Sequence, residues 1–151
     1  MKLYSTKVDA RGGRSGMARS TDGRLEVSLS IPKEIGGDGG RGTNPEQLFA
    51  AGYSACFESA VRLVARKRKL PLADDSGISA EVALTRSEAG LFVISVVLEG
   101  HFPGLDHDTA ATLMKEGHEV CPYSNATRGN IDVELRLRGE TAPLHTATAG
   151  S

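Results

Sequence analysis

The chain contains two cysteines, Cys56 and Cys121, and their reactivity is the clearest chemical signal in the sequence. They lie far apart along the chain, unlike the pairs of a C-x-x-C redox motif or a zinc site, so their spacing alone does not show that they meet. In a reducing compartment two cysteines rarely form a permanent structural bridge. Each is therefore either a buried small hydrophobic residue or a working thiol.

Cys56 falls on the apolar face of a long predicted helix that covers residues 44–69. Asn44 can cap this helix, Pro45 suits its first position, and Glu46 places a negative charge in its positive first turn. Small and apolar residues then recur at intervals of three and four, as on the buried face of a helix. From its position alone, Cys56 is more often an inert core residue than a reactive one.

Cys121 differs because it directly precedes Pro122, which is well placed to begin a short helix. We expect this helix to run to about Arg128 and to be closed by Gly129 in the left-handed conformation. Cys121 is then the N-cap, where unpaired backbone N–H groups lower the pKa of a thiol. The proline thus predicts that Cys121 is presented rather than absorbed into the core, although a serine-like cap without redox role is the alternative.

The composition offers little support for other kinds of site. His118 and Cys121 could supply two metal ligands, but two ligands do not make a site, so we expect no metal. The glycine-rich stretch at residues 35–44 lacks the Gly-Lys-Ser/Thr ending of a phosphate-binding loop. A formal net charge of -1 gives no reason to expect a nucleic acid or an anionic membrane as partner.

The start of the chain lacks the apolar core of a signal peptide. No uncharged apolar run approaches the roughly 18 residues of a membrane span. We therefore expect a cytoplasmic protein that has no membrane partner.

The hydrophobic periodicity predicts an α+β fold. The expected elements are a strand at residues 23–31, the helix at 44–69, a hairpin of strands at 77–86 and 91–100, a helix at 105–119 capped by Asp106 or Asp108, and a strand at 131–139. This order lacks regular βαβ alternation. We expect a single domain over residues 1–139 and a disordered tail over residues 140–151.

Three segments together resemble a known family. They are TNPEQLFAAGYSACFESAVRLVAR from Thr43 to Arg66, VCPYSNATRGNIDV from Val120 to Val133, and GGRSG near the N-terminus. These closely resemble the organic hydroperoxide resistance proteins of the OsmC-like superfamily, up to about Gly139. The resemblance implies antiparallel sheets wrapped around a long central helix, in an intertwined homodimer with two active sites at its interface.

The resemblance also implies roles for four residues of a thiol peroxidase. Cys56 corresponds to the peroxidatic cysteine and Cys121 to the resolving cysteine, while Arg14 and Glu46 correspond to an accessory arginine and glutamate. Members of the family reduce alkyl and fatty acid hydroperoxides, use no metal, haem or flavin, and are re-reduced by lipoyl groups. The alternative is a redox-sensing binding protein that uses the same disulfide as a switch.

The expected chemistry explains why these residue types are needed. Only a thiolate attacks a peroxide, and burial on an apolar helix face raises the pKa of a thiol unless a cation compensates, a charge that Arg14 can supply. Glu46 would orient Arg14. A sulfenic acid on Cys56 would then condense with Cys121. A dry pocket lined by residues such as Phe57 would favour apolar peroxides, and the alternative role of Phe57 is a core residue.

Glu46 and Cys56 cannot touch on one straight helix, because ten residues correspond to about 15 Å along the axis. Either the helix breaks between them, or Glu46 reaches the Cys56 of a second copy of the chain. The small residues of this helix, among them Gly52 and Ala55, would let another helix approach and favour the second copy.

Overall fold

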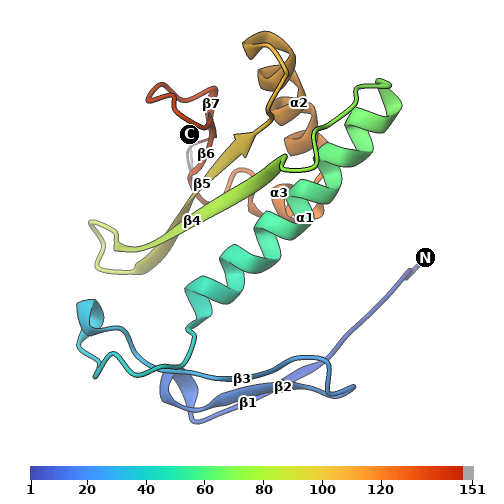
Figure 1. Ribbon diagram of the computed structural model, residues 1–151. Helices are drawn as coiled ribbons and strands as arrows, with labels where there is room; N and C mark the ends of the chain where they lie inside the picture. The colour runs from blue at the N-terminus through green and yellow to red at the C-terminus, as the bar shows by residue number, and fades with distance from the viewer. Residues whose placement is uncertain (148–151) are drawn as a thin grey trace. The chain divides into compact units, whose positions relative to one another are not determined.

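The computed structural model describes residues 1–147, and the chain divides into two units, Met1–Leu48 and Phe49–Ser151. The first unit is built on an antiparallel sheet in the order β1 (Val8–Arg11), β2 (Met17–Ser20) and β3 (Glu26–Ser28) (Figure 1). Only β3 falls within the predicted strand at residues 23–31. β1 was not predicted because it is exposed throughout and carries no hydrophobic alternation. β2 was not predicted because the residues that it buries, Ala18 and Ser20, are small or polar.

A tight turn joins β1 to β2 and contains the short 3₁₀ helix η1 (Gly13–Ser15). Gly12 enters this helix with a φ of 77°, which favours glycine. A side chain at Gly16 would place its Cβ 1.8 Å from the backbone oxygen of Arg11, so the turn closes only with glycine there. The GGRSG motif therefore fixes the backbone around Arg14.

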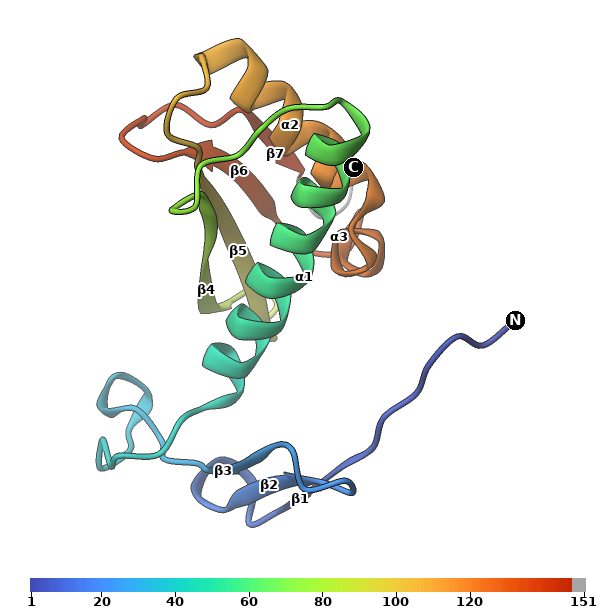
Figure 2. The same cartoon turned by 45° about the vertical axis from the view of Figure 1, so that its right-hand side comes forward.

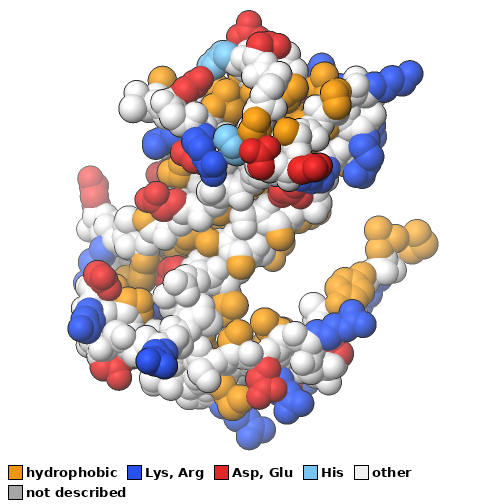
Figure 3. All heavy atoms as spheres, in the orientation of Figure 1, with side chains coloured by type: hydrophobic (Ala, Val, Ile, Leu, Met, Phe, Trp, Pro, Cys, Tyr) orange, Lys and Arg blue, Asp and Glu red, His pale blue; other side chains and the backbone are white. Residues whose placement is uncertain are grey.

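The most exposed apolar side chains of the described residues lie in two segments. The segment before β1 carries Met1, Leu3 and Tyr4 on its surface, as Figure 3 shows at its free end. Leu91 and Phe92 are also exposed, where β4 turns into β5.

After β3 the chain passes through the second 3₁₀ helix, η2 (Lys33–Ile35), and a glycine-rich loop to Asn44. The predicted loop at residues 35–44 is confirmed, with one isolated bridge between Leu29 and Thr43. Helix α1 (Pro45–Lys67) follows and matches the prediction within two residues. Asn44 caps it as expected, because its side-chain oxygen accepts a hydrogen bond from the Gln47 N–H at 2.8 Å.

The second unit contains a four-stranded sheet in the order β4 (Gly77–Arg86), β5 (Phe92–His101), β6 (Val133–Leu137) and β7 (His145–Ala147). The predicted β4–β5 hairpin is confirmed. The expectation of purely antiparallel sheets is wrong at one place, since β5 and β6 are parallel. The chain crosses from β5 to β6 through α2 (His107–Val120) and α3 (Pro122–Thr127). Because of this crossover, β6 runs in the same direction as β5.

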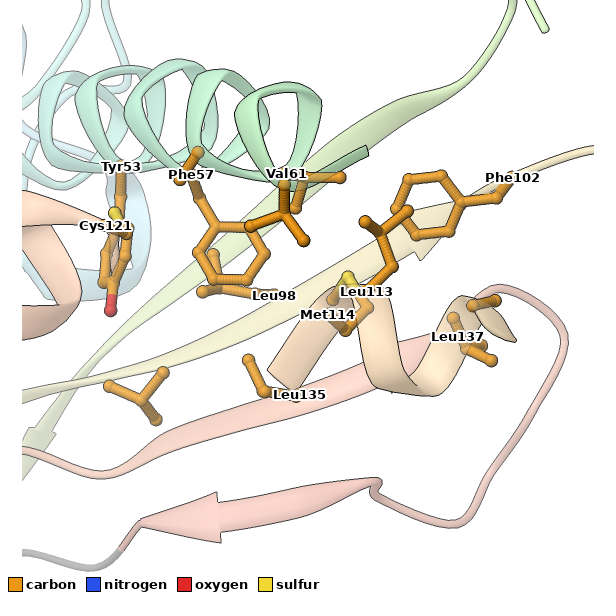
Figure 4. Packing of buried hydrophobic residues seen from close by; sticks show 14 of the residues in the cluster. Tyr53, Phe57, Val61, Leu98, Phe102, Leu113, Met114, Cys121, Leu135 and Leu137 are labelled. Carbon is orange, nitrogen blue, oxygen red and sulfur yellow. The ribbon is translucent and has the colours of Figure 1, made fainter. Parts of the chain in front are cut away.

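Helices α1 and α2 cover one face of this sheet, and Figures 1 and 2 show both on the same side. The face is apolar because buried residues alternate along the strands, as at Val96 and Leu98 in β5. These residues form one core with α1 and α2 (Figure 4), whose largest fully buried members are Tyr53, Phe57, Leu98, Leu113, Met114 and Leu135. The predicted α+β class is thus confirmed.

Helix α1 is long and apolar enough to cross a membrane by length and composition alone. A core helix of a soluble protein meets the same criterion. Successive turns of α1 pack into this core through Tyr53, Phe57, Val61 and Val64. Its apolar character is therefore explained by packing against the sheet.

The predicted disordered tail differs from the structure at His145–Ala147, which form β7 and pair antiparallel with β6. The pairing satisfies backbone groups on the outer edge of β6, which a prediction from composition does not take into account. Residues 148–151 of the predicted tail lie outside the described residues, and the single domain over residues 1–139 stays a prediction.

Gly100 in β5 provides a test of this packing. A Cβ there would lie 2.5 Å from the Phe102 ring and 2.6 Å from the Met114 sulfur, inside the core. We expect Gly100→Val to lower the free energy of unfolding by about 1–3 kcal/mol through overpacking. Urea titration measures it.

Gly77→Val is the matched control, because a Cβ at Gly77 meets no heavy atom within 4 Å and the residue lies on the neighbouring strand. Its effect should stay within about 0.5 kcal/mol. Equal effects of the two substitutions would contradict the packing described for Gly100.

Candidate active site

Arg14 and Glu46 meet within the first unit, although they are distant in sequence. Two guanidinium nitrogens of Arg14 donate to the two carboxylate oxygens of Glu46, at 2.8 and 2.6 Å. Through this hydrogen bonding Glu46 raises the pKa of Arg14, and Arg14 lowers the pKa of Glu46. The pair is partly exposed, and a two-pronged geometry of this kind fixes the plane of the guanidinium.

Cys56 and Cys121 meet within the second unit, and both are free thiols. Cys56 lies partly buried on α1, and Cys121 is fully buried between α2 and α3. Cys121 lies near enough to Cys56 to raise the pKa of its thiol, and Cys56 packs against the buried cluster that contains Cys121. The structure therefore brings together the two cysteines that sequence spacing could not place.

The electrostatic setting of Cys56 opposes its ionisation. Burial raises the pKa of the Cys56 thiol most, and the neighbouring Cys121 raises it further. The backbone N–H of Tyr123, in the first turn of α3, lowers it by donating a hydrogen bond to the sulfur. Arg14 belongs to the other unit, so among the described residues 49–147 this N–H is the group that favours the thiolate.

Cys121 is the N-cap of α3 with Pro122 in the first turn, and Gly129 follows with a φ of 75°, as predicted. The prediction that Cys121 is presented at the surface is wrong, because the residue is fully buried. The same residue is also the C-cap of α2, and its N–H donates to the Gly117 carbonyl oxygen at 3.0 Å. The chain turns a corner there, and both helices around the corner pack into the core.

Three aromatic rings pack together on α1 and α3, the helices at which the thiols lie. The Tyr53 ring on α1 is tilted against the Tyr123 ring, with ring centroids 5.6 Å apart. The Phe49 ring, also on α1, lies edge-to-face against Tyr123, with centroids 6.2 Å apart. Gly52 makes this possible, because a Cβ there would lie 2.6 Å from the Tyr123 hydroxyl. Phe49 and Tyr123 remain partly exposed and form an apolar surface beside the cysteines.

Of the two roles left open for Phe57, pocket lining and core packing, the structure supports the second, because Phe57 is fully buried. Its ring lies against Tyr53 and His118 in the core (Figure 4). It therefore has a packing role, and the apolar surface near the thiols comes from the rings of Phe49 and Tyr123.

A buried polar cluster lies on the other side of Cys121, and the sequence did not indicate it. The Ser124 hydroxyl pairs with His118 Nδ1 at 2.8 Å and with the Tyr53 hydroxyl at 3.0 Å. Burial lowers the pKa of His118 to about 4, helped by the charges of Arg128 and His145 and opposed by Glu119. Among residues 1–147, no three His, Cys, Asp or Glu side chains gather as a metal site would require.

The fold and these two clusters define an α+β protein with a dithiol centre, and comparison with known proteins gives its family. A family model described as OsmC-like protein matches residues 36–136, so the chain belongs to the OsmC-like family. Within this family, the chain is similar to proteins named organic hydroperoxide resistance protein. It is 51% identical over 135 residues to the protein of that name from Xanthomonas axonopodis pv. citri (strain 306), covering 89% of this chain and 94% of the relative.

Solved structures agree with this assignment. An organic hydroperoxide resistance protein from Legionella pneumophila superposes with a TM-score of 0.85 and 49% identity, over 91% of this chain and 98% of that one. The organic hydroperoxide resistance protein OhrB of Bacillus subtilis gives a TM-score of 0.82 and 45% identity, over 91% and 100% of the two chains. The OsmC-like fold is therefore confirmed.

The low pKa of His118 predicts a specific loss of stability in acid. Unfolding lets the imidazole bind a proton that the folded chain excludes between its ordinary pKa of 6.5 and about 4. We expect stability to fall as pH falls through this range, by at most about 1.4 kcal/mol per pH unit from this group. Denaturant titrations at several pH values measure the slope.

His118→Asn is the comparison, because its side chain can still pair with Ser124 but does not titrate. The variant should lose less stability over the same pH range. Carboxylates with lowered pKa values, such as Asp106, act equally in both proteins and cancel in the difference. Parallel slopes would show that His118 is not buried in its neutral form.

Proposed function

We propose that the protein is a cysteine-based peroxidase that reduces organic hydroperoxides to alcohols. The proximity of the free thiols of Cys56 and Cys121 carries this proposal, because a thiol peroxidase of this type needs a second sulfur near the first. The names of the relatives support a substrate that is an organic hydroperoxide.

Cys56 carries out the first step. Its thiolate attacks the terminal oxygen of the hydroperoxide, the O–O bond breaks, and the alkoxide leaves as the alcohol after it takes a proton. Cys56 becomes a sulfenic acid, so sulfur is oxidised and the peroxide reduced by two electrons. Because its surroundings raise the pKa of Cys56, a cation is needed, and Arg14, held by Glu46, is our candidate.

Cys121 carries out the second step. Its sulfur attacks the sulfenic sulfur of Cys56, water leaves, and a disulfide forms. An external dithiol then reduces this disulfide by exchange, and we propose lipoyl groups as that reductant. The electrons pass between sulfur and oxygen alone, so the cycle requires no metal, haem or flavin.

The apolar surroundings suit a substrate with a hydrocarbon tail. Phe49 and Tyr123 expose part of their rings beside the thiols. Burial of an alkyl or fatty acid chain there is favourable, whereas hydrogen peroxide gains nothing from such a surface. We therefore propose a preference for alkyl and fatty acid hydroperoxides.

Arg14 and Glu46 would act on the Cys56 of a second copy in a homodimer. Helix α1 runs unbroken from Pro45 to Lys67, so a break between Glu46 and Cys56 is excluded. The exposed apolar residues Met1, Leu3 and Phe92 provide surface that such a dimer would cover. We place this dimer in the cytoplasm, where a reducing environment keeps both thiols free.

Separate serine variants test the two cysteine roles. We expect Cys56→Ser to abolish reduction of cumene hydroperoxide by dihydrolipoamide, because the attacking thiolate is gone. Cys121→Ser should consume about one equivalent of peroxide to form the sulfenic acid and a second as this acid is overoxidised to sulfinic acid. Peroxide assays and mass spectrometry measure both.

The same assay on the wild type distinguishes an enzyme from a redox sensor. Catalytic consumption of peroxide supports the peroxidase. Consumption that stops after one equivalent per chain, with dihydrolipoamide still present, would favour a sensor whose disulfide switches an interaction.

Mixed dimers test whether Arg14 acts across the interface. Arg14→Ala and Cys56→Ser chains should each be inactive alone. Refolded together, they should recover about a quarter of the wild-type specific activity, because half the dimers are mixed and each has one complete site.

A mixture of Cys56→Ser with Cys121→Ser chains is the control. It should recover nothing, since both thiols of one site come from the same chain. Failure of the Arg14→Ala mixture to recover activity would contradict action across the dimer.

A further inference from the structure

The corner between α2 and α3 is held by side chains on both sides of Cys121. His118 lies three residues before Cys121 and Ser124 three residues after it, and His118 Nδ1 pairs with the Ser124 hydroxyl at 2.8 Å. Arg128 adds a second link, because its guanidinium donates to the His118 carbonyl oxygen at 2.7 Å. The angle between the two helices, and with it the place of Cys121, depends on these bonds.

The same serine ties α3 to the helix that carries Cys56. Tyr53 lies three residues, about one turn, before Cys56 on α1. Its hydroxyl pairs with Ser124 and with Thr127, both at 3.0 Å. Figure 4 shows Tyr53 reaching from α1 to lie beside Cys121. Ser124 is thus bonded to one residue on each helix that flanks the dithiol.

The cluster is buried, which makes its bonds selective. Ser124 is fully buried, and His118 and Thr127 are 3% and 7% exposed. A buried hydroxyl cannot exchange a lost partner for water, so the arrangement with all hydroxyl groups paired is strongly preferred over displaced ones. A shift of α3 along α1 would break the bonds from Ser124 and Thr127 to Tyr53 together.

We propose that Ser124 is a positioning residue that holds the Cys121 sulfur in line to attack an oxidised Cys56. The inference rests on the proposed thiol peroxidase function and adds a residue to its second step. Ser124 does not touch the peroxide and takes no proton in this role. It acts through Cys121, by joining α3 to His118 on α2 and to Tyr53 on α1.

The role predicts that the two chemical steps respond differently. Attack of Cys56 on the peroxide does not use the Cys121 sulfur and depends on α3 only through the Tyr123 N–H, so its rate should change much less than that of disulfide formation when Ser124 loses its hydroxyl. Disulfide formation requires two sulfur atoms in one geometry, and a misplacement of about 1 Å in such a step can cost a hundredfold in rate. The sulfenic acid should then persist and react with more peroxide.

The test follows both steps in reduced wild type, Ser124→Ala and Ser124→Thr after one equivalent of cumene hydroperoxide. Samples quenched in acid over time are analysed by intact-mass spectrometry, which distinguishes sulfenic acid, disulfide and sulfinic acid. In Ser124→Ala we expect disulfide formation slower by about tenfold or more, and the loss of the Cys56 thiol slowed by a much smaller factor. Ser124→Thr, which keeps the hydroxyl, should recover most of the rate.

Leu137→Ala is the matched control, because it removes buried volume at the far end of the same core from Cys121 (Figure 4). It should destabilise the chain without changing the ratio of the two rates. Tyr53→Phe removes one hydroxyl bond and keeps the ring, so it should slow disulfide formation in the same direction if Ser124→Ala does not fold.

The outcomes separate the inference from the function beneath it. A wild type that forms no disulfide would refute the proposed function itself. A wild type that forms it, with Ser124→Ala and Tyr53→Phe at the same rate, would overturn the positioning role. Equal slowing of both steps in Ser124→Ala would also overturn it, because that result indicates a general loss of structure.

Discussion

Burial of the Cys56 thiol beside a second thiol is the constraint on which the rest of the site depends. Removal from water raises the pKa of Cys56, and so does Cys121. The proximity that would allow a disulfide therefore opposes the ionisation that peroxide attack requires. The Tyr123 N–H partly compensates, because it lowers the pKa of Cys56. Arg14 is our candidate for the further positive charge that the thiolate needs.

The corner at Cys121 is how the fold brings the second thiol to the first. Cys121 ends α2 and begins α3, and Pro122 lets the new helix start without losing a backbone hydrogen bond. The crossover that contains this corner also makes β6 run parallel to β5. One connection thus completes the sheet, covers it with α2, and places Cys121 against α1.

Arg14 and Glu46 form a rigid pair in the unit Met1–Leu48, whereas both cysteines belong to Phe49–Ser151. The cationic group and the sulfur chemistry are therefore built by separate parts of the chain. Each part is ordered by its own contacts, a closed glycine turn in one and a buried hydroxyl cluster in the other.

The sequence by itself determined the features that neighbouring residues control. The cap at Asn44, the length of α1, the β4–β5 hairpin and the short helix after Cys121 follow from local spacing, proline and glycine, and the motifs were sufficient for the family. Only the tertiary structure decided that Cys56 and Cys121 lie near each other, that Cys121 is the more buried of the two, and that Phe57 is core. It also revealed Ser124, since a lone serine in a short helix has no periodic signal. These features depend on which faces pack together, and that is set by contacts between residues far apart in sequence.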